Sequence, residues 1–179
     1  SEAERQRIEE MNAVCEAALD EPEPEPDPHR EGIDWIRTEE GYLHHPLQHR
    51  CFESAIRFQH QIDELGLPQS GGADVEQFIF ELQTTSAKLA GALSGIARGA
   101  DVTDPSFTVA YLKRALDHLH KSQAGLEAVA ANKVLPEALI ADARKELFEI
   151  REGILRLMDE YRGRTCAEHL PLTGAYVSF

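Results

Sequence analysis

The sequence has 179 residues, of which 42% are hydrophobic and 28% are charged. This length and balance predict one folded domain with room for an extension. The 32 acidic residues outnumber the 18 basic ones, which gives a formal net charge of −14. Because phosphate affinity comes from basic side chains, we expect no nucleic-acid partner. No apolar run of about 18 residues is present, so we expect no membrane-spanning helix and no membrane partner.

The compartment is predicted from the start of the sequence and from its cysteines. The N-terminal ten residues, SEAERQRIEE, are charged and lack the apolar centre of a secretory signal. Cys15, Cys51 and Cys166 are odd in number and widely spaced, which does not indicate a disulfide framework. Both features favour a reducing, cytoplasmic location.

Residues 1–43 are predicted to form an acidic arm that differs from the rest of the chain. Residues 1–40 contain 14 acidic and 4 basic residues, whereas residues 41–179 contain 18 and 14. An apolar stripe at helical spacing predicts a helix over about residues 3–19, and its members are Ile8, Met11, Cys15 and Leu19. A single narrow stripe makes a marginal helix in water, so we expect this helix to dock on its own bundle, a second subunit or a partner.

The second part of the arm contains the segment EPEPEPDP. Proline at every second position excludes a helix, and neighbouring acids repel each other, so residues 20–31 are predicted to be an extended linker. A connector over residues 32–43 follows. It contains the single tryptophan, Trp35, which we expect to pack where the arm joins the rest of the protein.

Residues 44–163 carry four stretches of apolar residues spaced alternately by three and four. Their predicted limits are Pro46 to Gly66, Asp74 to Gly99, Asp104-Pro105 to about Ala130, and Pro136 to Gly163. Short connections between such helices favour an antiparallel up-down four-helix bundle. The predicted fold is therefore all-α, with an additional N-terminal helix on the acidic linker and a short irregular tail over residues 164–179.

Two further groups of residues are candidates for contact surfaces. In the tail, Leu172, Tyr176 and Phe179 are predicted to cover the bundle or a neighbouring subunit, or to serve as a peptide ligand for another protein. In the second bundle helix, Gly91 and Gly95 lie on a flank of small residues. Such a flank lets another helix approach closely, either inside the bundle or across a subunit interface.

Four side chains near the start of the bundle are of the types that bind divalent metals. They are His45, His49, Glu53 and His60. On a helix, His49, Glu53 and His60 share one face, and imidazole with carboxylate can hold an ion such as Zn²⁺. The face lies opposite the apolar stripe, so the alternative is a solvated polar surface. We therefore predict no cofactor, with a divalent metal as the alternative.

Three polar residues interrupt the apolar stripes near the helix midpoints: Ser54, Thr85 and Gln123. If the helices alternate in direction, these side chains meet at one level of the core. Buried polar groups need hydrogen-bond partners. The group is therefore predicted either to fix the register of the helices or to line a small-ligand pocket.

The segment from His118 to Gly125 resembles the H-x-x-K-G pattern of histidine phosphotransfer domains, in which an exposed histidine on a four-helix bundle accepts a phosphoryl group. His118 and Lys121 match the pattern, whereas Ser122 stands where the family has glycine. The resemblance covers about eight residues and implies His118 as the phosphate acceptor. The alternative is an ordinary surface histidine.

No nucleotide-binding, hydrolase or zinc-protease motif occurs in the sequence. We therefore expect a non-catalytic interaction or assembly module that binds a protein partner or associates with itself. The alternatives are a bundle that binds a metal or small ligand, and a phosphotransfer module that uses His118. Charge alone also permits an acidic DNA mimic, although most of the excess charge lies in the arm.

Overall fold

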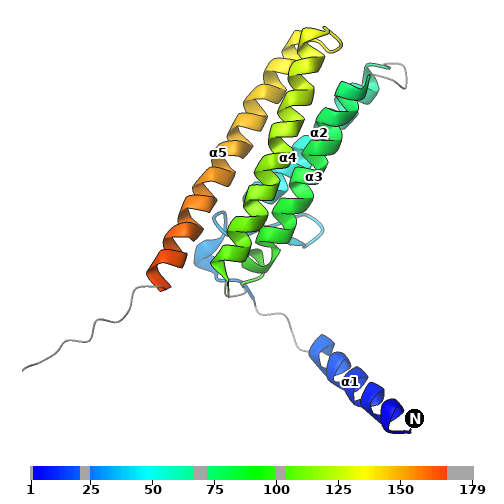
Figure 1. Cartoon of the computed structure of the whole chain (residues 1–179), viewed down its shortest axis with the longest axis vertical. Coiled ribbons are helices and arrows are strands. Elements are labelled where there is room, and N and C mark those ends of the chain that lie inside the picture. Colours follow the sequence, from blue (N-terminus) through cyan, green and yellow to red (C-terminus); the bar gives the residue numbers. More distant parts are fainter. Residues whose placement is uncertain (1, 21–24, 67–71, 100–103, 169–179) are drawn as a thin grey trace, which may run out of the picture.

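The computed structural model describes residues 2–20, 25–66, 72–99 and 104–168, with the backbone alone for 3, 13–20 and 165–168. Four helices form a bundle: α2 (Pro46–Glu64), α3 (Ala73–Ala97), α4 (Pro105–Ala131) and α5 (Glu137–Glu168). Consecutive helices run in opposite directions and pack side by side, and α5 closes the ring against α2 (Figure 1). The predicted all-α bundle with an additional N-terminal helix is confirmed.

Local sequence signals mark the starts of α2 and α4 and the end of α3 as predicted. At the start of α2, the His45 ring Nδ1 accepts a hydrogen bond from the Leu47 main-chain N–H at 3.1 Å, and Pro46 occupies the first turn. At the start of α4, the Asp104 carboxylate accepts one from the Ser106 N–H at 2.8 Å. Gly99 follows α3 with a φ of +76°, a left-handed conformation that favours glycine.

The core is a continuous set of apolar side chains from all four bundle helices. Its largest fully buried members include Phe58, Phe78, Leu82, Leu89, Leu93, Leu112, Leu119, Leu126, Ile150 and Ile154. The Phe58 and Phe78 rings join α2 to α3 with their centroids 5.8 Å apart. The burial of this surface is the main stabilising contribution to the bundle.

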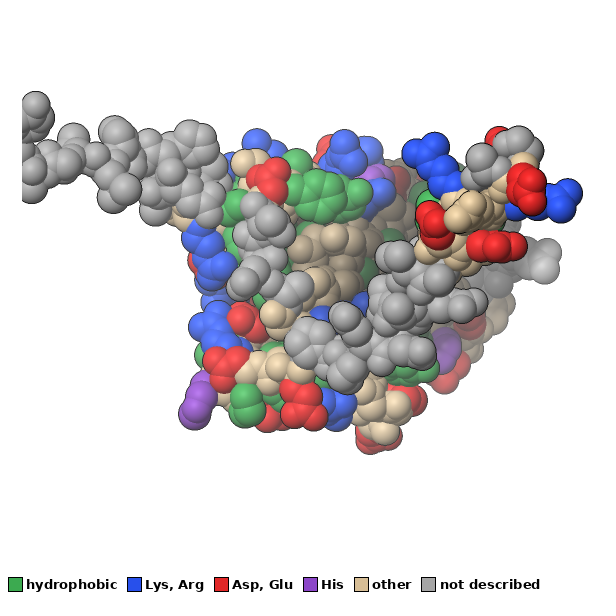
Figure 2. Space-filling model, turned by 90° about the horizontal axis from the view of Figure 1, so that it is seen from below, with side chains coloured by type: hydrophobic (Ala, Val, Ile, Leu, Met, Phe, Trp, Pro, Cys, Tyr) green, Lys and Arg blue, Asp and Glu red, His purple; other side chains and the backbone are tan. Residues whose placement is uncertain are grey.

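A short connector covers one end of the bundle. It contains a 3₁₀ turn, η1 (Pro28–Arg30), and an antiparallel pair of two-residue strands, β1 (Ile36–Arg37) and β2 (Leu43–His44). Trp35 is buried, and its ring N–H donates to the Asp27 carbonyl oxygen at 3.0 Å. Charged side chains of both signs surround this end of the molecule, with hydrophobic side chains visible between them (Figure 2).

The connector differs from prediction in two ways. Pro26 lies in the predicted extended linker of residues 20–31, but it is buried and packs beside Gly99. The strand pair was not predicted. As expected, Trp35 lies where the arm joins the bundle, in a pocket that it shares with Ile96 and Tyr161. The arm is therefore docked on the bundle from Pro26 onward within the described residues.

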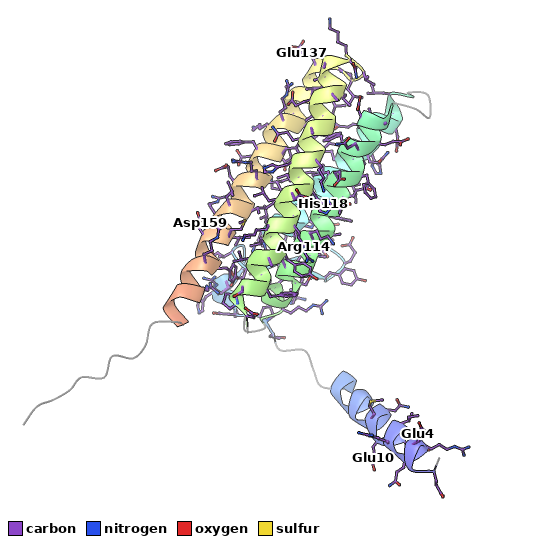
Figure 3. The ribbon with its side chains drawn as sticks, viewed as in Figure 1. Glu4, Glu10, Arg114, His118, Glu137 and Asp159 are labelled. Atoms are coloured by element: carbon purple, nitrogen blue, oxygen red, sulfur yellow. The ribbon has the colours of Figure 1, made fainter. Side chains whose placement is uncertain are left out.

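The N-terminal helix α1 (Glu2–Asp20), on which Glu4 and Glu10 are labelled, lies apart from the bundle (Figure 3). At the other end of the chain, α5 continues past Gly163, where the sequence analysis predicted its end. Gly163 has a helical conformation there, so the glycine does not terminate the helix. Among the helices of the described ranges, none combines the length and apolar composition needed to cross a membrane.

Candidate functional site

A groove of about 730 Å³ lies between the β1–β2 connector and the helices α2 and α3. We call it the hairpin groove and define it by its lining residues: Thr38, Glu40, Tyr42, His44, Gln48, His49, Phe52, Glu53, Ala55, Ile56, Gln83, Ser86, Ala87 and Ala90. The strand pair carries one wall, and the first half of α2 with the middle of α3 carries the other. The volume falls in the range of ligand-binding clefts in proteins.

Aromatic rings occupy both walls of the hairpin groove. The Tyr42 and His44 rings meet edge to face with centroids 6.5 Å apart, and His44 stacks on His49 at 5.9 Å. Two of the lining aromatic residues remain largely exposed, Tyr42 at 66% and Phe52 at 49%. These faces offer flat apolar surface to a bound group.

Gln48 supplies a buried polar group to the groove. The residue is only 8% exposed, and its Nε2 atom lies 2.9 Å from His44 Nδ1. Its Oε1 atom is buried and has no hydrogen-bond partner within the described residues. An unpaired buried carbonyl oxygen costs free energy, because it has lost water without gaining a donor. This oxygen is therefore prepared to accept a hydrogen bond.

The groove lining carries the carboxylates of Glu40 and Glu53 and contains neither lysine nor arginine. Hydrogen bonds to the Glu40 carboxylate, from its own main-chain N–H and from the Thr38 side chain, lower the pKa of Glu40. Smaller electrostatic contributions to the pKa of Glu40 in the same direction come from His49 and His44. Glu40 is therefore ionised at neutral pH and gives the mouth of the groove an acidic character.

The small residues predicted on α3 divide between two environments. Ala87 and Ala90 line the hairpin groove, where their short side chains leave it open. A Cβ atom on Gly91 would lie 3.0 Å from the Tyr111 ring of α4, so this glycine serves packing inside the bundle. Gly95 is exposed. Gly125 of α4, which was not predicted as a packing position, lies against backbone atoms of α3.

The four predicted metal ligands do not converge. His45 is buried as the cap of α2, and burial lowers the pKa of its ring to about 4. His49 and Glu53 line the hairpin groove, whereas His60 is exposed further along α2. Within the described part of the chain, no group of three or more His, Cys, Asp or Glu side chains is placed to hold a metal ion.

The predicted polar layer is not formed as a group. The Ser54 hydroxyl donates to Glu146 of α5 at 2.9 Å, and the Thr85 hydroxyl donates to the Glu81 carbonyl oxygen of its own helix at 2.8 Å. Gln123 is exposed, so its assignment to the core is wrong. The buried polar side chain at that level of α4 is its neighbour, Ser122.

His118 lies on the side of α4 that faces α3 (Figure 3). Its Nδ1 atom is 2.6 Å from Glu81 Oε2, and its side chain is 24% exposed, so it is more buried than predicted. Lys121 pairs with Asp117 instead of His118. Ser122, at the family's glycine position, is fully buried against α3. The residues of the phosphotransfer pattern therefore face different neighbours.

Only some of the predicted contact residues of the arm and tail lie in the described part of the chain. Ile8 and Met11 of α1 are 50% and 60% exposed. The side chains of Cys15 and Leu19, and all of Leu172, Tyr176 and Phe179, lie outside the described residues. The exposed pair on α1 leaves an apolar surface uncovered.

Tyr42, Gln48 and Phe52 were not predicted as site residues. One signal was present: the segment Glu39-Glu40-Gly41 separates two short stretches with strand-forming residues, which is typical of a hairpin turn. Comparison of the chain with protein-family models, with curated proteins and with solved structures finds no match.

Proposed function

We propose that this protein is a non-catalytic binding module that holds a segment of a partner protein in the hairpin groove. The observation that carries the proposal is that the side chains of Tyr42 and Phe52 are exposed in a groove whose volume suits a ligand. Exposed aromatic side chains are enriched where proteins bind other proteins. On a highly charged protein, an apolar concave surface favours this role.

The α1 helix supports the same proposal. Its exposed residues Ile8 and Met11 lie on one side of a helix that has no place in the bundle core. An amphipathic helix gains stability by burying its apolar side against another surface. We therefore propose α1 as a second contact with the partner.

Site-specific photocrosslinking tests this function. A photoreactive phenylalanine analogue replaces Phe52 in one sample and Phe148 in a control sample. Phe148 suits the control because it is 56% exposed and lies on α5 beside α4, on another side of the bundle. We expect a protein from the source cells to be captured through position 52 only.

A second step establishes that the captured protein binds the groove. The purified candidate is titrated against the unmodified protein and against the Phe52→Ser and Phe148→Ser variants. We expect Phe52→Ser to weaken binding at least tenfold and Phe148→Ser to leave it unchanged. Equal capture at both positions, or binding that does not depend on Phe52, would contradict the proposal.

The volume of the groove favours a small organic ligand as the second candidate. Native mass spectrometry of protein purified without added metal distinguishes the two. A stoichiometric small-molecule mass that is lost in the Phe52→Ser variant would favour this candidate over a protein partner.

A further inference from the structure

The acidic side chains of the hairpin groove favour a basic partner. Its lining contains two carboxylates, Glu40 and Glu53, and neither lysine nor arginine. The arginines that follow on α2 are already paired with α5: Arg50 with Glu146, and Arg57 with Asp142. A cation that enters the groove therefore meets carboxylates without a competing guanidinium from the lining.

The unpaired oxygen of Gln48 identifies the hydrogen-bonding character of the missing group. The amide nitrogen of Gln48 is engaged with His44, which leaves the carbonyl Oε1 as the buried atom without a partner in the described residues. A carbonyl oxygen only accepts hydrogen bonds, so the complementary group is a donor. The two carboxylates are also acceptors, and all three positions therefore favour a guest that is rich in N–H groups.

The aromatic rings of the groove favour arginine over lysine as this guest. Tyr42 and Phe52 present exposed rings at the groove. A guanidinium is planar, carries five N–H donors and stacks on aromatic faces, whereas an ammonium is more strongly hydrated and has three donors. One arginine side chain can therefore satisfy carboxylate, amide oxygen and ring at once.

The acidic charge of the chain disfavours two other occupants of the groove, a second copy of the protein and its own helix α1. A second copy carries the same net charge of −14 and would be repelled. The α1 segment Glu2–Asp20 holds six acidic residues and two arginines, so it is also a poor match for an acidic groove. A basic segment of another protein is the occupant with complementary charge.

We infer, on the basis of the proposed function, that the hairpin groove recognises a basic segment of its partner. An arginine of that segment lies between Glu40 and Glu53 and donates a hydrogen bond to Gln48 Oε1. Its guanidinium plane packs on the ring of Tyr42 or Phe52. Neither carboxylate nor the amide changes covalently, so the contact is reversible.

The test is a titration of the full-length protein with short peptides, followed by NMR. The peptides have one Gly/Ser/Ala framework and carry four arginines, four lysines, four citrullines or four glutamates. Citrulline keeps the planar shape of arginine without the charge, and it has three N–H donors and a carbonyl oxygen where arginine has five N–H donors. We expect the arginine peptide to shift the side-chain amide signals of Gln48. We also expect it to bind at least tenfold more tightly than the citrulline peptide and severalfold more tightly than the lysine peptide.

Charge-matched variants separate the groove from the overall acidity of the protein. Glu40→Gln with Glu53→Gln removes the two groove carboxylates. Glu76→Gln with Glu137→Gln removes two exposed carboxylates elsewhere, and leaves the same net charge. We expect the first pair of substitutions to weaken binding of the arginine peptide at least tenfold. The second pair should weaken it by less than twofold. Equal weakening would overturn the inference, because binding would then follow net charge alone.

The Gln48→Met variant tests the hydrogen bond, with a thermal melt as the check on folding. We expect it to remain folded and to lose most of the preference for arginine over lysine. An unchanged preference would overturn the role of Gln48. Binding of N-acetylarginine amide as tight as that of the peptide would overturn the assignment to a protein segment.

The outcomes also separate this inference from the proposed function. If the crosslinked partner binds through Phe52 but the peptides show no preference for arginine, the inference is wrong and the proposed function stands. If position 52 captures no protein and none of the peptides shifts the groove signals, both are wrong.

Discussion

The side-chain hydroxyl of Ser122 donates a hydrogen bond of 2.7 Å to the main-chain carbonyl oxygen of Phe78, and so joins α4 to α3. One turn further along α4, Gly125 lies against the same part of α3. The two small residues allow these helices to approach closely, and the fully buried Ser122 keeps its polar group paired.

Gly125→Ala is expected to destabilise the bundle. The added Cβ atom would lie 2.8 Å from the Phe78 nitrogen and 2.9 Å from the Asp74 carbonyl oxygen. Because both are backbone atoms, α3 and α4 must move apart. Overpacking costs roughly 1–3 kcal/mol, which exceeds the gain of about 1 kcal/mol from helix propensity. Urea denaturation should show a lower free energy of unfolding.

Gly163→Ala is the matched control for this substitution. Gly163 also lies in a helix, but an added Cβ atom would meet nothing within 4 Å. We expect this variant to keep or raise the free energy of unfolding, by up to about 1 kcal/mol. If both variants behaved alike, close packing at Gly125 would be contradicted.

His45 is expected to make stability fall as the pH is lowered. Burial lowers the pKa of His45 from its ordinary value of 6.5 to about 4. Between these values the unfolded chain binds a proton that the folded chain does not, so acidification favours unfolding. The loss at pH 5 amounts to roughly 2 kcal/mol relative to neutral pH. Urea denaturation at pH 7.5 and pH 5.0 measures it.

His45→Asn isolates this contribution from other titrating groups. Asparagine keeps a side-chain oxygen that can accept the Leu47 N–H at the start of α2, but it does not titrate. We expect the variant to lose roughly 2 kcal/mol less than the parent protein between the two pH values. An identical pH dependence in both proteins would contradict the buried neutral state of His45.

Gln48→Met is expected to stabilise the protein without ligand. The substitution removes the unpaired Oε1 atom, whose burial costs roughly 1–3 kcal/mol, and gives up the hydrogen bond to His44. The half-buried His44 ring can bond to water instead, so we expect a net gain of about 1 kcal/mol in the free energy of unfolding. Chemical denaturation of both proteins measures it.

The same substitution at Gln59 serves as the control for Gln48→Met. Gln59 lies on the same helix, and its Nε2 atom donates to Asp63 on the exposed side at 2.8 Å. We expect Gln59→Met to change the free energy of unfolding by less than about 0.5 kcal/mol. A loss of stability in Gln48→Met would show that its amide is fully paired in solution.

The apolar side of α1 is expected to contribute nothing to the stability of the bundle. Ile8 and Met11 are half exposed or more, so the double variant Ile8→Gln, Met11→Gln should unfold at the same urea concentration as the parent. Leu89→Ala in the core is the positive control, with an expected loss of roughly 2–5 kcal/mol. A shifted midpoint in the double variant would mean that α1 packs on the bundle in solution.

Most of the fold could be predicted because its signals are local. Pro46 and Asp104-Pro105 mark helix starts through their own backbone geometry, and Gly99 marks an end through its left-handed conformation. Gly163 did not end its helix, because glycine only permits a left-handed backbone and does not require one.

The contacts between helices were harder to predict because the residues that form them meet only after packing. Ser122 and Gln123 are neighbours in sequence, and a small rotation of α4 decides which of them is buried. The pairing of His118 with Glu81 crosses between two helices in the same way. Such choices depend on how side chains on facing helices fit together, and spacing within one helix does not contain that information.

The sequence by itself determined that four amphipathic helices form a bundle with an acidic arm, because apolar spacing and helix-capping residues act over a few neighbouring positions. Tertiary structure alone decided that Tyr42 of the connector, Gln48 of α2 and Ala87 of α3 line one groove. It also decided that the Gln48 carbonyl is left without a donor there. The physical reason is that burial and hydrogen bonding depend on the distances between segments, which are fixed only when the whole core packs.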